Sequence, residues 1–210
     1  QKNHTCGYAI SPLIGGGSAD SEFELLTGMS LHFLPENTCP YNQYVIQDIP
    51  SLLRTLDDNG YDTRCVFPDS RKIYSRGALL KFLGESPEHA FWGEEQDGWI
   101  HHLSEGTGPI PENIRTADDL VIDQILAEVR QAQTPYYIHA FTISSHSPYS
   151  YYSRLPASLG LGVSGASSES ARQEQLAYFW SLRKVDAAIG RLLEQLRHDP
   201  RKTVVLLVGD

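Results

Sequence analysis

The chain has 210 residues, of which 40% are hydrophobic, and a formal net charge of −9 at pH 7. This length supports one substantial hydrophobic core, and the negative charge disfavours non-specific binding to nucleic acid or to an anionic membrane, because both depend on a cationic protein surface. The sequence has no apolar run of about 18 residues and no basic segment leading into an apolar one, so it predicts neither a transmembrane helix nor a signal peptide.

Helices and strands are predicted to alternate along the chain. The hydrophobic periods and capping residues predict helices over residues 18–29, 49–61, 75–84, 116–133 and 175–198, and strands over residues 61–67, 136–143 and 203–208. Residues 85–117 and 153–171 show no clear period and are expected to be irregular. Because strands separated by long helices need crossover connections, the fold class is α/β, with a mostly parallel sheet and helices on both faces.

The residues that follow the predicted strands are the most informative, because ligands of parallel sheets bind at the carboxyl ends of the strands. They include Asp69, residues 144–146 and Asp210. The chain begins without Met and stops at Asp210, where the last strand would run into a loop. We therefore expect residues 1–210 to form one catalytic domain that lacks its first strand and the segment after Asp210, so that the fold is incomplete at both ends.

Three cysteines, Cys6, Cys39 and Cys65, lack the spacing of a metal-binding motif. Cys6 and Cys39 lie in polar, turn-rich segments that suit a disulfide in an oxidising compartment, whereas Cys65 belongs to a predicted strand and is expected to be buried. The sequence leaves the disulfide pairing open.

The segment 14–30, IGGGSADSEFELLTGMS, places three glycines directly before Ser18 and a predicted helix. Glycines let a ligand approach the backbone, and the positive end of a helix favours an anion, so Ser18 suits an attacking hydroxyl beside a phosphate. The simpler interpretation of these residues alone is that Ser18 caps the helix while Asp20 and Glu22 complement its dipole. The spacing fits neither the G-x-S-x-G nucleophile elbow nor the G-x-x-x-x-G-K-[ST] phosphate loop.

Four segments follow one another along the chain: GGGSADSEF, FPDSRKIYSRG, FTISSHSPY and the closing LRKVDAAIGRLLEQLRHDPRKTVVLLVGD. In this order they resemble motifs of the lipoteichoic acid synthase family, the phosphoglycerol and phosphoethanolamine transferases of the alkaline phosphatase and sulfatase superfamily. The resemblance spans residues 11–210 and implies an alkaline phosphatase-like fold. It also implies that Ser18 is the catalytic nucleophile rather than only a cap.

The middle motifs of this resemblance imply the substrate contacts. Asp69, Tyr74 and Arg76 match substrate-contacting positions of the second motif, and His146 matches the substrate-binding histidine of the third. We expect Arg76 to bind phosphate oxygens as a fork and His146 to hydrogen-bond the substrate or protonate a departing oxygen. Phe67 departs from the family pattern, which usually has His at this position.

The resemblance also implies a divalent metal ion, Mn²⁺, Mg²⁺ or Zn²⁺. Ser18 and Asp210 would bind it together with a glutamate upstream of residue 1 and a histidine directly after Asp210. Hard oxygen ligands of this kind suit such ions. We expect the 210-residue piece itself to bind metal poorly and to be inactive, because the other two ligands lie outside it.

The function implied is the transfer of phosphoglycerol or phosphoethanolamine from a phospholipid to a glycan or lipid acceptor of the cell envelope, through a phosphoryl-serine intermediate. The implied location is the outer face or periplasmic side of a bacterial cell membrane, in a protein whose full length is membrane-anchored, with no nucleic-acid partner. The alternatives are a phosphodiesterase or sulfatase-type hydrolase and a non-catalytic binding remnant. The C/S-x-P-x-R pattern of sulfatase maturation is absent, which disfavours sulfate ester hydrolysis. The sequence leaves the oligomeric state open.

Overall fold

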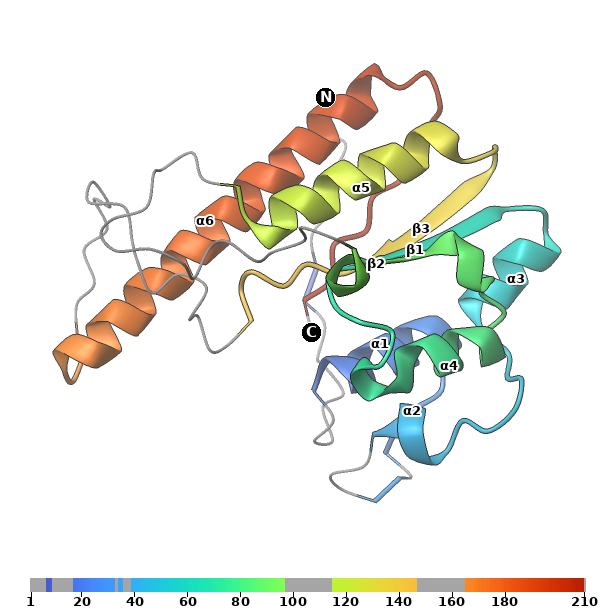
Figure 1. Ribbon diagram of the computed structural model, residues 1–210, viewed down its shortest axis with the longest axis horizontal. Coiled ribbons are helices and arrows are strands. Elements are labelled where there is room, and N and C mark those ends of the chain that lie inside the picture. Colours follow the sequence, from blue (N-terminus) through green and yellow to red (C-terminus); the bar gives the residue numbers. More distant parts are fainter. Residues whose placement is uncertain are drawn as a thin grey trace. The chain divides into compact units, whose positions relative to one another are not determined.

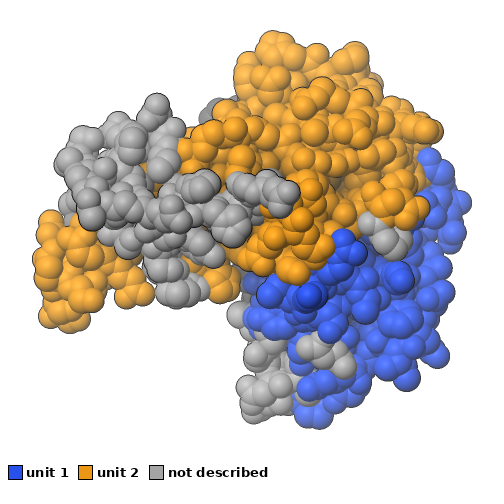
Figure 2. Space-filling model, in the orientation of Figure 1, with its two compact units in different colours: residues 1–60, 71–87, 204–210 blue, residues 61–70, 88–203 orange. Residues whose placement is uncertain are grey.

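The computed structural model describes residues 7–8, 17–32, 34–35, 39–96, 115–146 and 165–209. The chain divides into two compact units, coloured separately in Figure 2. The first unit comprises residues 1–60, 71–87 and 204–210, and the second comprises residues 61–70 and 88–203. The single catalytic domain expected from the sequence stays a prediction.

The second unit contains a three-stranded parallel sheet (Figure 1). Its strands are β1 (Asp62–Phe67), β2 (Ala90–Trp92) and β3 (Tyr136–Ala140), in the order β2-β1-β3. Phe67 pairs with Trp92 and Val66 pairs with Ala140, so the carboxyl ends of all three strands meet at one edge. The predicted α/β class with a parallel sheet is confirmed.

The central strand β1 has the composition that a doubly covered strand requires. Cys65, Val66 and Phe67 have no exposed surface, because a strand of a parallel sheet is buried on both faces. Strand β2 lies in the segment 85–117, which was expected to be irregular, so that expectation is wrong for the described residues 85–96. With three residues between the 3-10 helices η2 (Pro87–His89) and η3 (Gly93–Glu95), β2 is too short to show a period.

Two long helices accompany the sheet in the second unit. Helix α5 (Ala117–Gln131) contacts β1 and β3, and α6 (Glu169–His198) packs along α5 (Figure 1). Thr116, the first residue of the predicted helix, is the N-cap of α5. Its hydroxyl accepts a hydrogen bond from the Asp119 amide, and the Asp119 side chain accepts one from the Thr116 amide. Helix α6 begins earlier than predicted, inside the segment 153–171, because Ser168 caps it through the Ala171 amide at 3.1 Å. Residues 153–164 of that segment lie outside the described residues.

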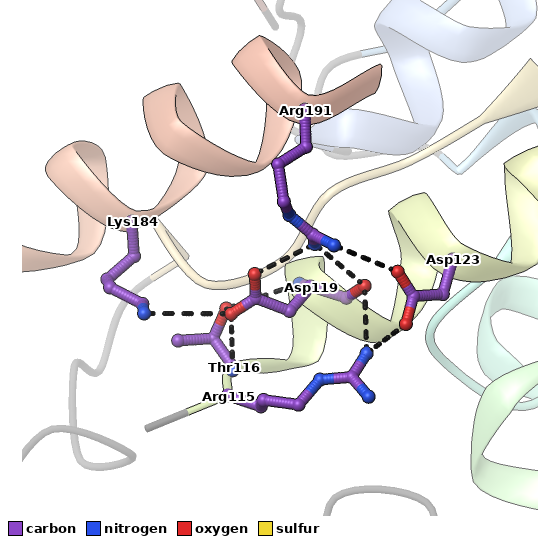
Figure 3. Close-up of polar contacts among 6 residues, drawn as sticks. All are labelled: Arg115, Thr116, Asp119, Asp123, Lys184 and Arg191. Carbon is purple, nitrogen blue, oxygen red and sulfur yellow. Dashed lines mark hydrogen bonds and ion pairs between the residues drawn. The ribbon is translucent and has the colours of Figure 1, made fainter. Parts of the chain in front are cut away.

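Charged side chains also join α5 to α6 (Figure 3). Asp119 pairs with Arg191 at 2.9 Å and with Lys184 at 3.7 Å. Arg191 reaches Asp123 at 3.0 Å, and Arg115 contacts the same aspartate. Arg191 and Asp123 are half-exposed, and a pair of this kind contributes about 0–1 kcal/mol, so we expect it to orient the two helices more than it stabilises them.

The predicted buried strand over residues 203–208 is wrong. Residues 202–209 have no regular secondary structure, and Val204 and Leu206 are 94% and 75% exposed. An apolar segment forms a stable strand only when a neighbouring strand satisfies its backbone groups and a second layer covers its side chains. In the described part of the chain, no strand pairs with residues 203–208.

The first unit is built from short helices. They are α1 (Ser18–Thr27), α2 (Pro40–Gln43), α3 (Leu52–Asp58), η1 (Ile73–Ser75) and α4 (Arg76–Phe82). The predicted helices 18–29, 49–61 and 75–84 are confirmed with shorter bounds, whereas α2 was not predicted. Gly84 follows α4 at φ +92°, and a Cβ there would come within 2.9 Å of the Arg54 side chain. The turn after α4 therefore requires a glycine.

The structure does not support the suggested disulfide. Cys39 is a half-buried thiol and Cys65 is buried, as predicted, and both are in the reduced form. Cys6 lies outside the described residues. None of the helices in the described part of the chain is both long and apolar enough to cross a membrane.

The packing of α6 on α5 predicts unequal effects of two adjacent leucines. Leu192 is 7% exposed and packs in a cluster with Ile122 and Ala188, whereas Leu193 is 37% exposed. We expect Leu192→Ala to lower the free energy of unfolding by about 2–4 kcal/mol, because it leaves a cavity, and Leu193→Ala to lower it by less than about 1 kcal/mol. Urea unfolding of both variants measures the difference, and equal losses would contradict the described packing.

Candidate functional site

Ser18 is the first residue of α1 and not its cap. The N-cap is Gly17, whose φ of +65° and ψ of −140° suit glycine, and it forms no side-chain capping bond. Ser18 is half-buried, and its hydroxyl makes no hydrogen bond to another residue that the structure describes. The interpretation of Ser18 as a helix cap is therefore wrong.

Glu22 lies one turn after Ser18 in α1 and is buried. Its side chain was interpreted as a complement to the helix dipole, but the Glu22 Oε2 atom accepts hydrogen bonds from Arg76 Nε at 2.9 Å and from the Tyr41 hydroxyl at 2.5 Å. Glu22, Arg76 and Tyr41 are 1%, 3% and 4% exposed. A carboxylate held this far from water needs such partners, because an unpaired buried charge costs several kcal/mol. We call these three residues the Glu22 network.

Arg76 enters this network from a turn with unusual backbone geometry. The two residues before it, Tyr74 and Ser75, have φ angles of +51° and +56°. Residues other than glycine rarely adopt such angles, and each costs of order 1–3 kcal/mol. Tyr74 is 43% exposed, so the turn presents its ring to solvent while Arg76 points into the interior. Arg76 is thus buried and ion-paired, and its Nε edge is directed to Glu22.

Aromatic rings cover the carboxyl edge of the sheet in the second unit. The Phe67 ring stacks on Trp92 with 4.8 Å between centroids and lies 6.0 Å from Phe141 and 5.9 Å from His139. Phe67 has no exposed surface and thus fills a core position. Asp69, two residues later, is half-buried at the same edge.

The segment after β3 is held by a buried aspartate. Asp118, in the first turn of α5, has no exposed surface and accepts hydrogen bonds from the Ile143 amide at 2.8 Å and the Ser144 amide at 3.2 Å. The His146 amide donates to the Ile143 carbonyl at 2.9 Å, and the His146 side chain is exposed. Burial raises the pKa of Asp118, and the two backbone amides offset part of that rise. Asp118 therefore fixes the turn that carries His146.

The structure thus distributes the predicted site residues over both units. Ser18, Tyr74 and Arg76 belong to the first unit, Asp69 and His146 lie at the carboxyl edge of the sheet in the second, and Asp210 lies outside the described residues. Sequence reasoning missed the supporting residues Tyr41 and Asp118. No sequence signal identifies Tyr41, since it becomes a partner of Glu22 only through packing. For Asp118 the available signal was an acidic residue in the first turn of a helix, which is common.

Comparison with known proteins decides the family. The sequence profile of the sulfatase family matches residues 4–210. The chain belongs to the sulfatase family. A protein of Rhizobium meliloti (strain 1021), provisionally named as a cyclic beta-1,2-glucan modification protein, is 28% identical over 204 residues, which are 97% of this chain and 30% of that protein.

A solved structure confirms the fold of this family member. The crystal structure of the lipoteichoic acid synthase LtaP from Listeria monocytogenes matches with a TM-score of 0.56 and 19% identity, over 85% of this chain and 40% of that one. The expected sulfatase family is therefore confirmed by the profile, and this likeness shows that the chain shares the fold of the synthase. The chain spans about a third of the curated relative and two fifths of the solved one.

The sulfatase family generally uses a divalent metal ion. The described residues contain no group of three His, Cys, Asp or Glu side chains placed to hold one. The Ser18 hydroxyl fits the chemistry of such a site, because it is an oxygen donor with no other hydrogen-bond partner in the described structure. Asp210, the other predicted ligand in this chain, lies outside the described residues.

The raised pKa of Asp118 predicts a pH dependence of stability. The folded protein holds the proton of Asp118 more tightly than the unfolded chain, whose pKa is near 3.8, so this contribution is present below pH 3.8 and is lost as pH rises through the folded pKa. Asp118→Asn keeps an acceptor for the Ile143 amide but cannot ionise. We expect the stability of the wild type relative to Asp118→Asn to fall as pH rises from 3.8.

Urea unfolding at a series of pH values measures this difference. A difference that is independent of pH, or that grows in favour of the wild type as pH rises, would contradict the assignment of Asp118 as a carboxyl destabilised by burial.

Proposed function

We propose that this sulfatase-family chain belongs to a phosphotransferase that moves phosphoglycerol or phosphoethanolamine from a phospholipid to an acceptor of the cell envelope. The reaction passes through a phosphoryl-serine intermediate on Ser18. The observation that carries the proposal is the placement of Ser18 as the first residue of α1, after a glycine with positive φ, with a hydroxyl that makes no hydrogen bond to another described residue.

The position of Ser18 suits attack on a phosphodiester. The amides of the first turn of α1 are directed toward the N-terminal end of the helix, where they favour a bound anion. Gly17 has no Cβ, and apart from its chain neighbours no described residue lies within 4 Å of the place where one would be, which favours close approach of a phosphate to the backbone there. A serine hydroxyl nevertheless needs activation before it attacks.

The proposed reaction has two displacements. The Ser18 hydroxyl would lose its proton to solvent as its Oγ atom forms a bond to phosphorus; the bond from phosphorus to the diacylglycerol oxygen would break, and that oxygen would take a proton from His146. An acceptor hydroxyl would then attack phosphorus and lose its proton to His146, and the bond from phosphorus to the Ser18 oxygen would break, so that Ser18 takes a proton back from solvent. The Nη groups of Arg76 would bind the phosphate oxygens as a fork, with its Nε on Glu22 Oε2. Asp69 and Tyr74 would contact the head group.

In this scheme, Ser18 and Asp210 would bind the metal ion that the family generally uses. When bound, it would lower the pKa of the Ser18 hydroxyl and neutralise charge on the phosphate. The chain's own residues then have the tasks of presenting the hydroxyl, orienting the phosphate and supplying a proton.

A glycan is the acceptor we favour, supported by the Rhizobium meliloti relative that is provisionally named for modification of cyclic beta-1,2-glucan. A phospholipid donor and an envelope glycan would meet at the outer face of the cytoplasmic membrane. We therefore place the proposed reaction on the extracytoplasmic side, in a full-length protein anchored to the membrane.

Removal of the nucleophile is the first test. We expect Ser18→Ala in the full-length protein to lower turnover at least about a thousandfold, because no other group can form the covalent intermediate. The assay follows diacylglycerol release from fluorescent phosphatidylglycerol or phosphatidylethanolamine, with and without cyclic glucan. Ser30→Ala, an exposed serine after α1, is the matched control and should keep full activity. Turnover by Ser18→Ala at the wild-type rate would rule out the mechanism, and head group released to water despite added glucan would favour a hydrolase.

Metal dependence is tested separately. Dialysis of the full-length protein against EDTA should abolish diacylglycerol release, and added Mn²⁺ or Mg²⁺ should restore it, because the serine then regains its activating ion. The variant Asp210→Asn should need more added metal for half-maximal activity. Unchanged activity after chelation would contradict the proposed use of a metal.

A further inference from the structure

We propose that Glu22 is a positioning residue that links the nucleophile's helix to the guanidinium that meets the phosphate, with Tyr41 holding the carboxylate in place. This inference rests on the proposed function of Ser18 and Arg76. It assigns a role in the reaction to a buried acid and a buried phenol that take no part in the chemistry themselves.

Helix geometry connects Glu22 to Ser18. The two residues are four apart in α1, so they lie on the same face of the helix, one turn apart. Side chains of a helix lean toward its N-terminus, so the Glu22 carboxylate is directed toward the turn that begins with Ser18. Rotation or displacement of the buried carboxylate would therefore change where the Ser18 hydroxyl is presented.

The same carboxylate oxygen fixes Arg76. Glu22 Oε2 accepts from Arg76 Nε at 2.9 Å, and a guanidinium is planar, so this bond also sets the directions of its Nη donors. Arg76 is the first residue of α4, after two residues with positive φ. The backbone thus accepts strain where the arginine turns inward, and strain of this kind is often retained at functional sites.

Tyr41 completes the arrangement from α2. Its hydroxyl donates to Glu22 Oε2 at 2.5 Å, and its ring lies 6.5 Å from the ring of Phe23, the residue after Glu22. Burial and the charge of Glu22 raise the pKa of Tyr41 well above its usual value, so the hydroxyl stays a donor at any pH at which the enzyme would work. The acceptor atom is therefore held by two donors from two other elements.

The alternative is that the Glu22 network only stabilises the fold, and kinetics separate the two roles. We expect Tyr41→Phe and Glu22→Gln in the full-length protein to lower kcat about 10–100-fold, with KM for the fluorescent phospholipid changed less than about threefold, because a misaimed nucleophile slows the chemical step. Leu53→Val is the matched control: Leu53 is fully buried in α3 of the same unit and takes no part in the Glu22 network, so it should lower the melting temperature without lowering kcat.

Each outcome is decisive. If Tyr41→Phe and Glu22→Gln keep the wild-type kcat and lose only melting temperature, as Leu53→Val should, the positioning role is overturned. If Glu22→Gln does not fold, Tyr41→Phe decides alone, because it removes one hydroxyl and keeps the ring. Ser18→Ala runs in the same assay: if it is inactive while the network variants are unaffected, only the positioning role fails, whereas an active Ser18→Ala overturns the proposed function as well.

Discussion

A carboxylate buried in the first unit must be neutralised, and this requirement organises the elements around the candidate nucleophile. Glu22 is 1% exposed and takes one hydrogen bond from Arg76 and one from Tyr41. Because a buried charge is costly without such partners, these two hydrogen bonds restrict how α1, α2 and α4 pack. Ser18 stands one turn from this carboxylate, so the constraint that orders the unit also determines where its hydroxyl is presented.

The second unit uses a buried acid in a comparable way. Three parallel strands bring their carboxyl ends to one edge, and Asp118 then holds the backbone that follows β3 through two amides. An aspartate with no exposed surface costs free energy to ionise, which its hydrogen bonds only partly offset. These hydrogen bonds fix the turn that carries His146. Thus buried acids, not surface ion pairs such as those between α5 and α6, set the segments to which chemistry is assigned.

The sequence predicted features whose cause is local. Helix α5 was predicted with Thr116 as its N-cap and acidic residues in its first turn, and Ser18 was singled out because glycines precede a helix. Prediction from the sequence failed where an element depends on residues that lie far away in the chain. The apolar run at 203–208 forms no strand without a paired neighbour, and strand β2 exists through its pairing with β1. Likewise, Arg76, one partner of Glu22, is 54 residues away in the sequence. The burial of Glu22 therefore becomes visible only in the folded structure.

The central claim is that α1, held by Glu22, presents Ser18 to a cation and a phosphate. The most direct measurement is a manganese-edge anomalous difference map from crystals of the full-length protein grown with Mn²⁺. The account predicts a peak within bonding distance of both the Ser18 hydroxyl and the Asp210 carboxylate, with Arg76 still on Glu22. A manganese ion bound elsewhere, with the Ser18 and Asp210 side chains far apart, would contradict it.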